Sequence, residues 1–144
     1  MNYLLSYVAY PGIRDKRIDA DVFISNSNIQ FLKVITEVVC TYYGLSVDEI
    51  KVNNQKRHIA MPRQMVFYIC HFLRKRYKVR GVSYAWMGEC FGKGHCTVIY
   101  SIKKISGEIL LYEDIRRDLS VILKKCDDKL WRFTKTDDII TSRL

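Results

Sequence analysis

The fold is decided by residues 84–105, which have the sequence YAWMGECFGKGHCTVIYSIKKI. Ser83, directly before them, is the predicted N-cap of a short helix, because its hydroxyl can accept a hydrogen bond from an amide of the first turn. The side of this helix that we expect to be buried consists of Ala85, Met87, Cys90 and Phe91. Gly92 and Gly94 can adopt the left-handed backbone conformation around Lys93, so they predict a tight turn after the helix.

A second helix is predicted to begin at His95, because apolar side chains then recur with helical spacing. Its expected buried stripe consists of Val98, Ile99, Ile102 and Ile105. His95, Cys96 and Thr97 occupy its first turn. Two helices joined by a turn that contains glycine are typical of the helix-turn-helix motif, whose second helix enters the major groove of DNA. The stretch therefore predicts binding to double-stranded DNA.

Positive charge is concentrated around this stretch. The chain has 144 residues and a net formal charge of +9. Residues 1–50 contain four Lys/Arg against six Asp/Glu (−2), residues 51–104 contain twelve against one (+11), and residues 105–144 contain eight against eight (0). Such concentration indicates a polyanionic partner, because each phosphate that a cation neutralises releases counterions. A solvated basic surface that serves only solubility is the alternative.

The rest of the chain predicts an all-α fold. Apolar periodicity indicates helices at about residues 28–43, 62–77 and 111–124. Gly44 is a favoured residue just past a helix end, and Pro62 suits a first helical turn, where its missing amide costs nothing. We expect Gly107 to end the helix that contains Ile105. Arg63 and Gln64 are expected on faces of their helix other than the buried one.

The connection between the first two of these helices carries two signals. Ser46 and Glu49 have capping-box spacing, which predicts a one-turn helix that ends near Ile50. Residues 51–58 are polar and cationic without apolar period, so we expect a basic loop there. The resulting domain organisation is an N-terminal extension (residues 1–27, irregular or with short strands such as 21–25), a helical domain (28–125) and a C-terminal tail (126–144).

Several other classes of protein are not indicated. The sequence has no apolar run of about 20 residues that could span a bilayer, and its start lacks the features of a signal peptide. Five scattered cysteines suit a reducing compartment, so we expect a cytoplasmic protein. Cys90, His95 and Cys96 are close in sequence, but no C-x-x-C pair accompanies them. We expect no metal, no cofactor and no enzymatic activity.

Residues from about 28 to 125 resemble the C-terminal DNA-binding domain of the bacterial replication initiator DnaA. The resemblance rests on YYGLSVDEI (42–50), the basic loop, AMPRQM (60–65), MGECFG (87–92) and GHCTVI (94–99). Where the family usually has Arg-Asp-His-Thr-Thr-Val, this chain has KGHCTV from Lys93 to Val98. The resemblance implies a helix-turn-helix domain that binds duplex DNA in replication initiation or transcription control, and it covers about two thirds of the chain.

The resemblance also implies roles for individual residues. His95 and Thr97, with Cys96 in place of the usual first Thr, would contact base edges in the major groove. Phosphates would be held by Lys103, Arg63, Gln64 and the backbone amides near Ser83.

The basic loop of the family places an arginine in the adjacent minor groove. Without gaps this position falls at Gln55, beside Lys56 and Arg57. We expect Lys56 or Arg57 to take the role after a small register shift.

Two departures from the family alter the expected DNA target. Gly94 replaces an Asp that contacts a base amine, and Cys96 lacks the Thr hydroxyl while keeping a surface for a thymine methyl group. Each lost base contact weakens discrimination by ~1–3 kcal/mol. The chain also contains no G-x-x-x-x-G-K-[ST] phosphate loop. We therefore expect a standalone binding protein, of a kind that a bacteriophage or mobile element would encode, that does not itself drive ATP-dependent melting of an origin.

Two alternative functions remain open at this point. The same fold could serve an interaction protein that uses residues 1–27 to bind a host or partner protein. Tyr84, Trp86 and Tyr100 could instead stack on single-stranded bases beside the basic loop, although such aromatics more often belong to a core or its rim.

Overall fold

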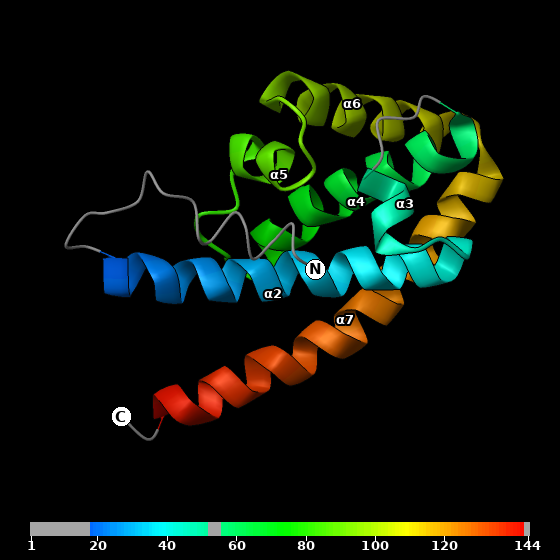
Figure 1. Ribbon diagram of the computed structural model, residues 1–144. Helices are drawn as coiled ribbons and strands as arrows, with labels where there is room; N and C mark the ends of the chain where they lie inside the picture. The colour runs from blue at the N-terminus through cyan, green and yellow to red at the C-terminus, as the bar shows by residue number, and fades with distance from the viewer. Residues whose placement is uncertain (1–17, 52–55, 143–144) are drawn as a thin grey trace.

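The computed structural model describes residues 18–51 and 56–142, and the side chains of residues 27–51 and 56–130. Residues 1–17, most of the predicted extension, lie outside the described residues, and so does Gln55. Within the described ranges every regular element is a helix (Figure 1), which confirms the all-α prediction.

The helices stack on one another in levels (Figure 1). In chain order they are α2 (Ile18–Tyr43), α3 (Val47–Lys51), α4 (Arg57–Arg76), α5 (Tyr84–Cys90), α6 (His95–Leu111) and α7 (Glu113–Ser142). The long helices α2 and α7 pack against each other, and α4 packs between α2 and α6. The short α5 packs under α6. The stack therefore places α6 at the edge of the domain farthest from α2.

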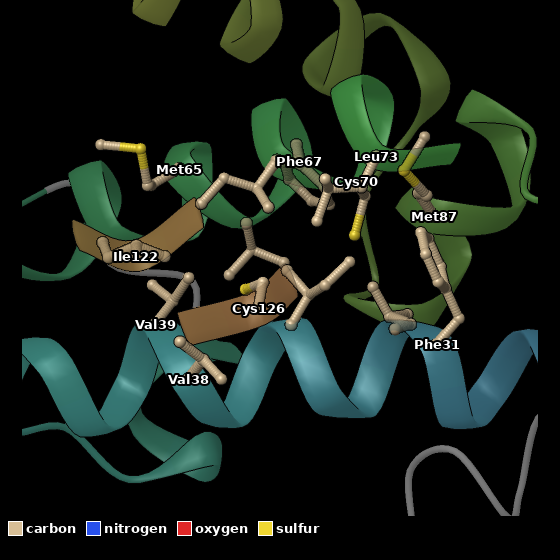
Figure 2. Packing of buried hydrophobic residues seen from close by; sticks show 14 of the residues in the cluster. Phe31, Val38, Val39, Met65, Phe67, Cys70, Leu73, Met87, Ile122 and Cys126 are labelled. Atoms are coloured by element: carbon tan, nitrogen blue, oxygen red, sulfur yellow. The ribbon is translucent and has the colours of Figure 1, made fainter. Parts of the chain in front are cut away.

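The apolar core lies where α2, α4 and α7 meet and continues beneath α5 and α6 (Figure 2). Its labelled members are Phe31, Val38 and Val39 from α2, Met65, Phe67, Cys70 and Leu73 from α4, Met87 from α5, and Ile122 and Cys126 from α7. Phe67 meets Phe91 edge to face, with ring centroids 5.2 Å apart. Each buried large apolar side chain stabilises the fold by about 1.5–3 kcal/mol. The core therefore fixes the helix-turn-helix segment against α4.

Two predicted helix boundaries at the N-terminal side are confirmed. α2 ends at Tyr43, and Gly44 follows it with a φ of 70°. The Ser46 hydroxyl accepts a hydrogen bond from the Glu49 amide at 3.1 Å, as the capping-box spacing predicts. This bond satisfies one of the free amides at the start of α3.

The predicted start of α2 is wrong. The helix begins at Ile18 rather than near Asn28, so residues 21–25 are helical and not a short strand. Asn28 lies inside the helix and is buried, at 5% exposure. No glycine or proline lies between Ile18 and Asn28, so nothing in this segment stops the helix.

The predicted start of α4 is also wrong. The helix begins at Arg57, with Lys56 as its N-cap, so Pro62 lies in the helix interior and not in its first turn. The basic loop is correspondingly shorter than residues 51–58. A proline inside a helix removes one hydrogen bond, here the one to the carbonyl of His58, a residue exposed to solvent. Pro62 itself is buried.

The last two helices are longer than the sequence pattern predicts. α6 passes through Gly107 to Leu111, because a helical glycine costs only about 1 kcal/mol and packing of the helix overrides it. α7 continues past residue 124 to Ser142, and Cys126 and Leu130 extend its buried stripe. Residues 126–142, predicted as a C-terminal tail, therefore continue α7.

We expect the protein to lose stability at alkaline pH, because several of its thiols are buried. Burial raises the pKa of Cys40 to about 11 and the pKa values of Cys90 and Cys126 to about 12, from an ordinary value of 9.0. Because these pKa values are higher in the folded chain, the unfolded chain releases protons first, and stability falls as the pH rises above about 9. Each thiol should remove about 1.4 kcal/mol per pH unit until its folded pKa is reached.

Urea unfolding at pH 7.5, 9 and 10.5 measures this effect. The Cys90→Ala variant should start less stable but lose stability less steeply with pH than the wild type. Equal slopes for the two proteins would show that the buried thiols do not control alkaline unfolding.

Candidate nucleic-acid interface

The N-terminus of α5 is capped as the sequence predicts. The Ser83 hydroxyl accepts a hydrogen bond from the Trp86 amide at 3.1 Å. Met87, Cys90 and Phe91 are buried, but Ala85 is exposed and Trp86 takes its place in the core. Trp86, Met87 and Cys90 have the spacing of one helical face, and this face of α5 turns inward.

The turn between α5 and α6 uses its glycines differently from the prediction. Gly92 has a φ of 66°, as expected for a left-handed residue. Gly94 is the N-cap of α6 with a φ of −78°, so its predicted left-handed conformation is wrong. Gly88, inside α5, is the glycine that the sequence analysis missed. A Cβ atom at Gly88 would lie 2.5 Å from the carbonyl oxygen of Lys93.

The turn folds back directly onto α5 at this point. The Lys93 amide donates a hydrogen bond to the Gly88 carbonyl at 2.7 Å. Only a residue without a side chain permits this approach of two backbone segments.

The first turn of α6 points away from the domain. Val98, Ile102 and Ile105 are buried, whereas the side chains of His95, Cys96 and Thr97 are exposed. The Cys96 sulfur lies 3.9 Å from Nε2 of His95. The structure therefore brings the three residues predicted to contact bases together on one accessible turn.

A hollow between α4 and α6 lies beside this turn. It has a volume of ≈ 410 Å³ and is called the α4–α6 hollow below. It is lined by Arg63 and Gln64 of α4, Lys93 of the turn, and Cys96, Thr97, Tyr100 and Ser101 of α6. Arg63 and Gln64 are only 5% and 8% exposed, so their predicted position on outer faces of the helix is wrong. They are buried because α6 packs across this side of α4.

The α4–α6 hollow is electrostatically positive. None of its lining residues is acidic. Burial lowers the pKa of Lys93, and the positive charge of Arg63 lowers it further. Burial likewise lowers the pKa of Arg63, whose Nη1 donates to the Ile50 carbonyl at 3.4 Å. An anionic group in the hollow would stabilise the charged forms of both Lys93 and Arg63. The hollow is therefore chemically suited to a phosphate.

Gln64, which also lines the hollow, carries an unsatisfied polar atom. Its Oε1 is buried and has no hydrogen-bond partner within the described part of the chain. Buried polar atoms without partners are rare in folded proteins and cost about 1–3 kcal/mol.

The remaining predicted positions lie farther along α6 or at the start of α4. Lys103 is exposed seven residues after Cys96, which places it on the same face two turns later. Lys56 and Arg57 are exposed at the N-terminus of α4. Arg57 lies 4.0 Å from the carboxylate of Glu108, which places the start of α4 beside the second half of α6.

The aromatic side chains do not form a common stacking surface. Trp86 is buried, and the Tyr84 hydroxyl lies 2.8 Å from Nδ1 of His71 in a partly buried contact. Tyr100 alone among the three is largely exposed, at 60%. It lines the α4–α6 hollow, and its spacing from Cys96 and Thr97 places it on their face, so it lies at the proposed duplex interface although the sequence suggested it only for single-strand stacking.

Two further properties concern only the described part of the chain. Its His, Cys, Asp and Glu side chains form no group of three or more that could hold a metal ion. None of its helices combines the length and the apolar character needed to cross a membrane.

The geometry defines a helix-turn-helix domain whose second helix is exposed over a positive surface. A family model described as the bacterial DnaA protein helix-turn-helix matches residues 32–105, half of the chain. The chain belongs to this family of DNA-binding domains.

Curated relatives agree with this assignment. The chromosomal replication initiator proteins DnaA of Caldanaerobacter subterraneus subsp. tengcongensis and of Thermoanaerobacter pseudethanolicus are each 29% identical to this chain over 130 residues. The similarity covers 85% of this chain but only 28% of each relative. The chain thus spans about a quarter of the length of the relatives that it matches.

Proposed function

We propose that this protein binds double-stranded DNA with a sequence preference and acts in replication initiation or in transcription control. His95, Cys96 and Thr97 contact base edges in the major groove, and a phosphate occupies the α4–α6 hollow. The observation that carries the proposal is the exposed first turn of α6 beside a hollow with two cations and no acid. The curated relatives, named as replication initiators, support the role in replication.

The span of the interface supports contact with two adjacent grooves. His95 and Glu108 are 13 residues apart on α6, which is about 20 Å at 1.5 Å per residue. Major and minor grooves alternate every half turn of B-DNA, or about 17 Å. Arg57 beside Glu108 therefore lies at a suitable distance for the minor groove when His95 lies in the major groove.

Selection of duplexes from a random pool tests the proposed function. We expect one enriched motif that differs from the standard initiator box, because Gly94 and Cys96 alter the contacts of the first turn. Binding at low salt with no enriched motif would leave only a non-specific DNA-binding protein. Absence of any duplex binding at low salt would contradict the proposal and favour the alternative of a protein-interaction domain.

Two single variants separate base contacts from phosphate contacts. His95→Ala should lower the affinity for the selected motif by about 1–3 kcal/mol while leaving random duplexes unchanged. Lys103→Ala should weaken all duplexes about equally and reduce the salt slope by about 1. Both side chains are exposed, so neither change should alter folding. Arg63→Ala, the variant that the sequence suggests for phosphate contact, would also disturb a buried site.

Fluorescence anisotropy with the selected duplex and a scrambled duplex measures both effects. Equal losses on the two duplexes for His95→Ala would contradict its role at a base edge. A loss confined to the selected duplex for Lys103→Ala would contradict its role at a phosphate.

A further inference from the structure

A second basic surface lies at the C-terminal end of α4 and in the segment that links α4 to α5. The segment from Arg74 to Arg80 contains five Lys/Arg, and no Asp or Glu occurs between Glu49 and Glu89. Lys75, Lys78 and Arg80 are exposed, and none forms an ion pair with another described residue. These three residues are called the linker surface. Its charges are therefore available to a partner.

The neighbouring cations Arg74 and Arg76 contact other residues of the domain, and these contacts hold the segment between α4 and α5 in place. Arg74 donates from Nη1 to the Val82 carbonyl at 2.7 Å and stacks over the Tyr84 ring at 4.5 Å. Arg76 pairs with Asp127 of α7 at 2.6 Å. The linker between α4 and α5 is thus fixed at both ends. The linker surface therefore has a defined position relative to α5.

The linker surface lies beside Ser83, one of the positions predicted to contact DNA. A hollow of ≈ 400 Å³ beside it is lined by Arg74, Lys75, Val79, Gly81, Val82 and Ser83. Ser83 is also the N-cap of α5, whose neighbouring amides are predicted to hold a phosphate. In Figure 1 the linker and the beginning of α6 lie toward the same end of the stack. A duplex on α6 that reaches Ser83 would next meet Lys75 and Arg80.

We propose that the linker surface binds phosphates of the same duplex, outside the base pairs that α6 contacts. This inference rests on the proposed function, since it extends the footprint of one bound duplex. Continuity with Ser83 favours DNA over a separate polyanion. The footprint is then asymmetric, because the linker lies on only one side of α6.

The variant Lys75→Gln/Arg80→Gln tests this inference. Lys78 is left unchanged because its φ of 53° lies in the left-handed region, where any residue other than glycine is strained. On a duplex with about ten flanking base pairs on each side, the salt slope should fall by about 2, at about 0.9 per lost phosphate contact. Affinity near 0.1 M salt should fall about tenfold. The matched control is Lys124→Gln/Lys129→Gln, which removes two exposed charges from α7.

Shortened duplexes make the test independent of any variant. Removing one flank should weaken the wild type about tenfold, and removing the opposite flank should change little. On the duplex that lacks the flank whose removal weakens wild-type binding, the linker variant and the wild type should bind with equal affinity.

The failures of the two proposals can be told apart. If neither flank matters, or if the linker variant and the α7 control behave alike, the linker inference is overturned while sequence preference through α6 stands. Equal losses for the linker variant on long and short duplexes would also overturn it. If the wild type binds no duplex at all, the proposed function itself fails.

Discussion

Gly88→Ala should destabilise the helix-turn-helix and abolish sequence-specific binding. The added Cβ would lie 2.5 Å from the Lys93 carbonyl oxygen and 3.1 Å from the backbone of Gly94. Both neighbours are backbone atoms, so the clash is relieved only by moving the turn away from α5. Overpacking of this kind costs about 1–3 kcal/mol. We expect a loss of stability near 3 kcal/mol in the variant, because moving the turn also weakens the hydrogen bond from the Lys93 amide to the Gly88 carbonyl.

Displacement of the turn also moves the start of α6. Lys93 and Gly94 directly precede His95, so the three exposed residues of the first turn would no longer keep their position over the α4–α6 hollow. Each lost base contact costs about 1–3 kcal/mol, so affinity for the selected duplex should fall by at least about tenfold. Urea unfolding and anisotropy on the same preparation measure the two effects.

Gly107→Ala is the matched control. Gly107 lies in α6, and a Cβ atom there would meet nothing within 4 Å. Alanine is favoured over glycine inside a helix by about 1 kcal/mol, so this variant should be slightly more stable and bind DNA normally. If Gly88→Ala were as stable as Gly107→Ala, the close approach of the turn to α5 would be wrong.

The contrast between these two glycines shows what the sequence could and could not predict. Both interrupt a helical pattern, and Gly107 was expected to end its helix. The structure passes through both, because tertiary packing of α5 and α6 outweighs the cost of a helical glycine. The fold requires glycine at position 88 because the backbone at Lys93, five residues away, packs against it. The spacing of apolar residues in the sequence carries no information about this contact.

The candidate site was predictable where one helix determines it. His95, Cys96 and Thr97 lie on the first turn of α6, and a helix start followed by a buried stripe places them outward. Arg63 and Gln64 were misplaced because their burial depends on how α6 crosses α4, a relation between distant segments. Tyr100 was considered only for stacking on single strands, because its place beside the duplex interface also depends on how α6 crosses α4.

Alkylation of Cys96 with N-ethylmaleimide should block DNA binding. Cys96 is exposed, whereas Cys40, Cys70, Cys90 and Cys126 are buried. Burial also raises the pKa of Cys90 and Cys126 to about 12, so these thiols stay protonated and unreactive near neutral pH. Mass spectrometry at pH 7.5 should therefore find one adduct on the native chain and five after denaturation, one for each cysteine in the sequence.

The adduct places a bulky group on the first turn of α6, between His95 and Thr97. If this turn enters the major groove, affinity for the selected duplex should fall by at least about tenfold, because the loss of even one base contact costs 1–3 kcal/mol. The Cys96→Ser variant, treated in the same way, should take no adduct on the native chain and bind the selected duplex as tightly after treatment as before it. This control separates an effect at Cys96 from damage elsewhere.

Protection gives a second result that does not depend on what the adduct does. A bound duplex that covers the first turn should slow alkylation of Cys96 in proportion to the fraction of protein bound, and a scrambled duplex should protect less at the same concentration. Unchanged alkylation in the presence of a saturating selected duplex would place Cys96 outside the interface. The bound DNA would then lie on another surface, and the assignment of α6 to the major groove would be wrong even if the protein binds DNA tightly.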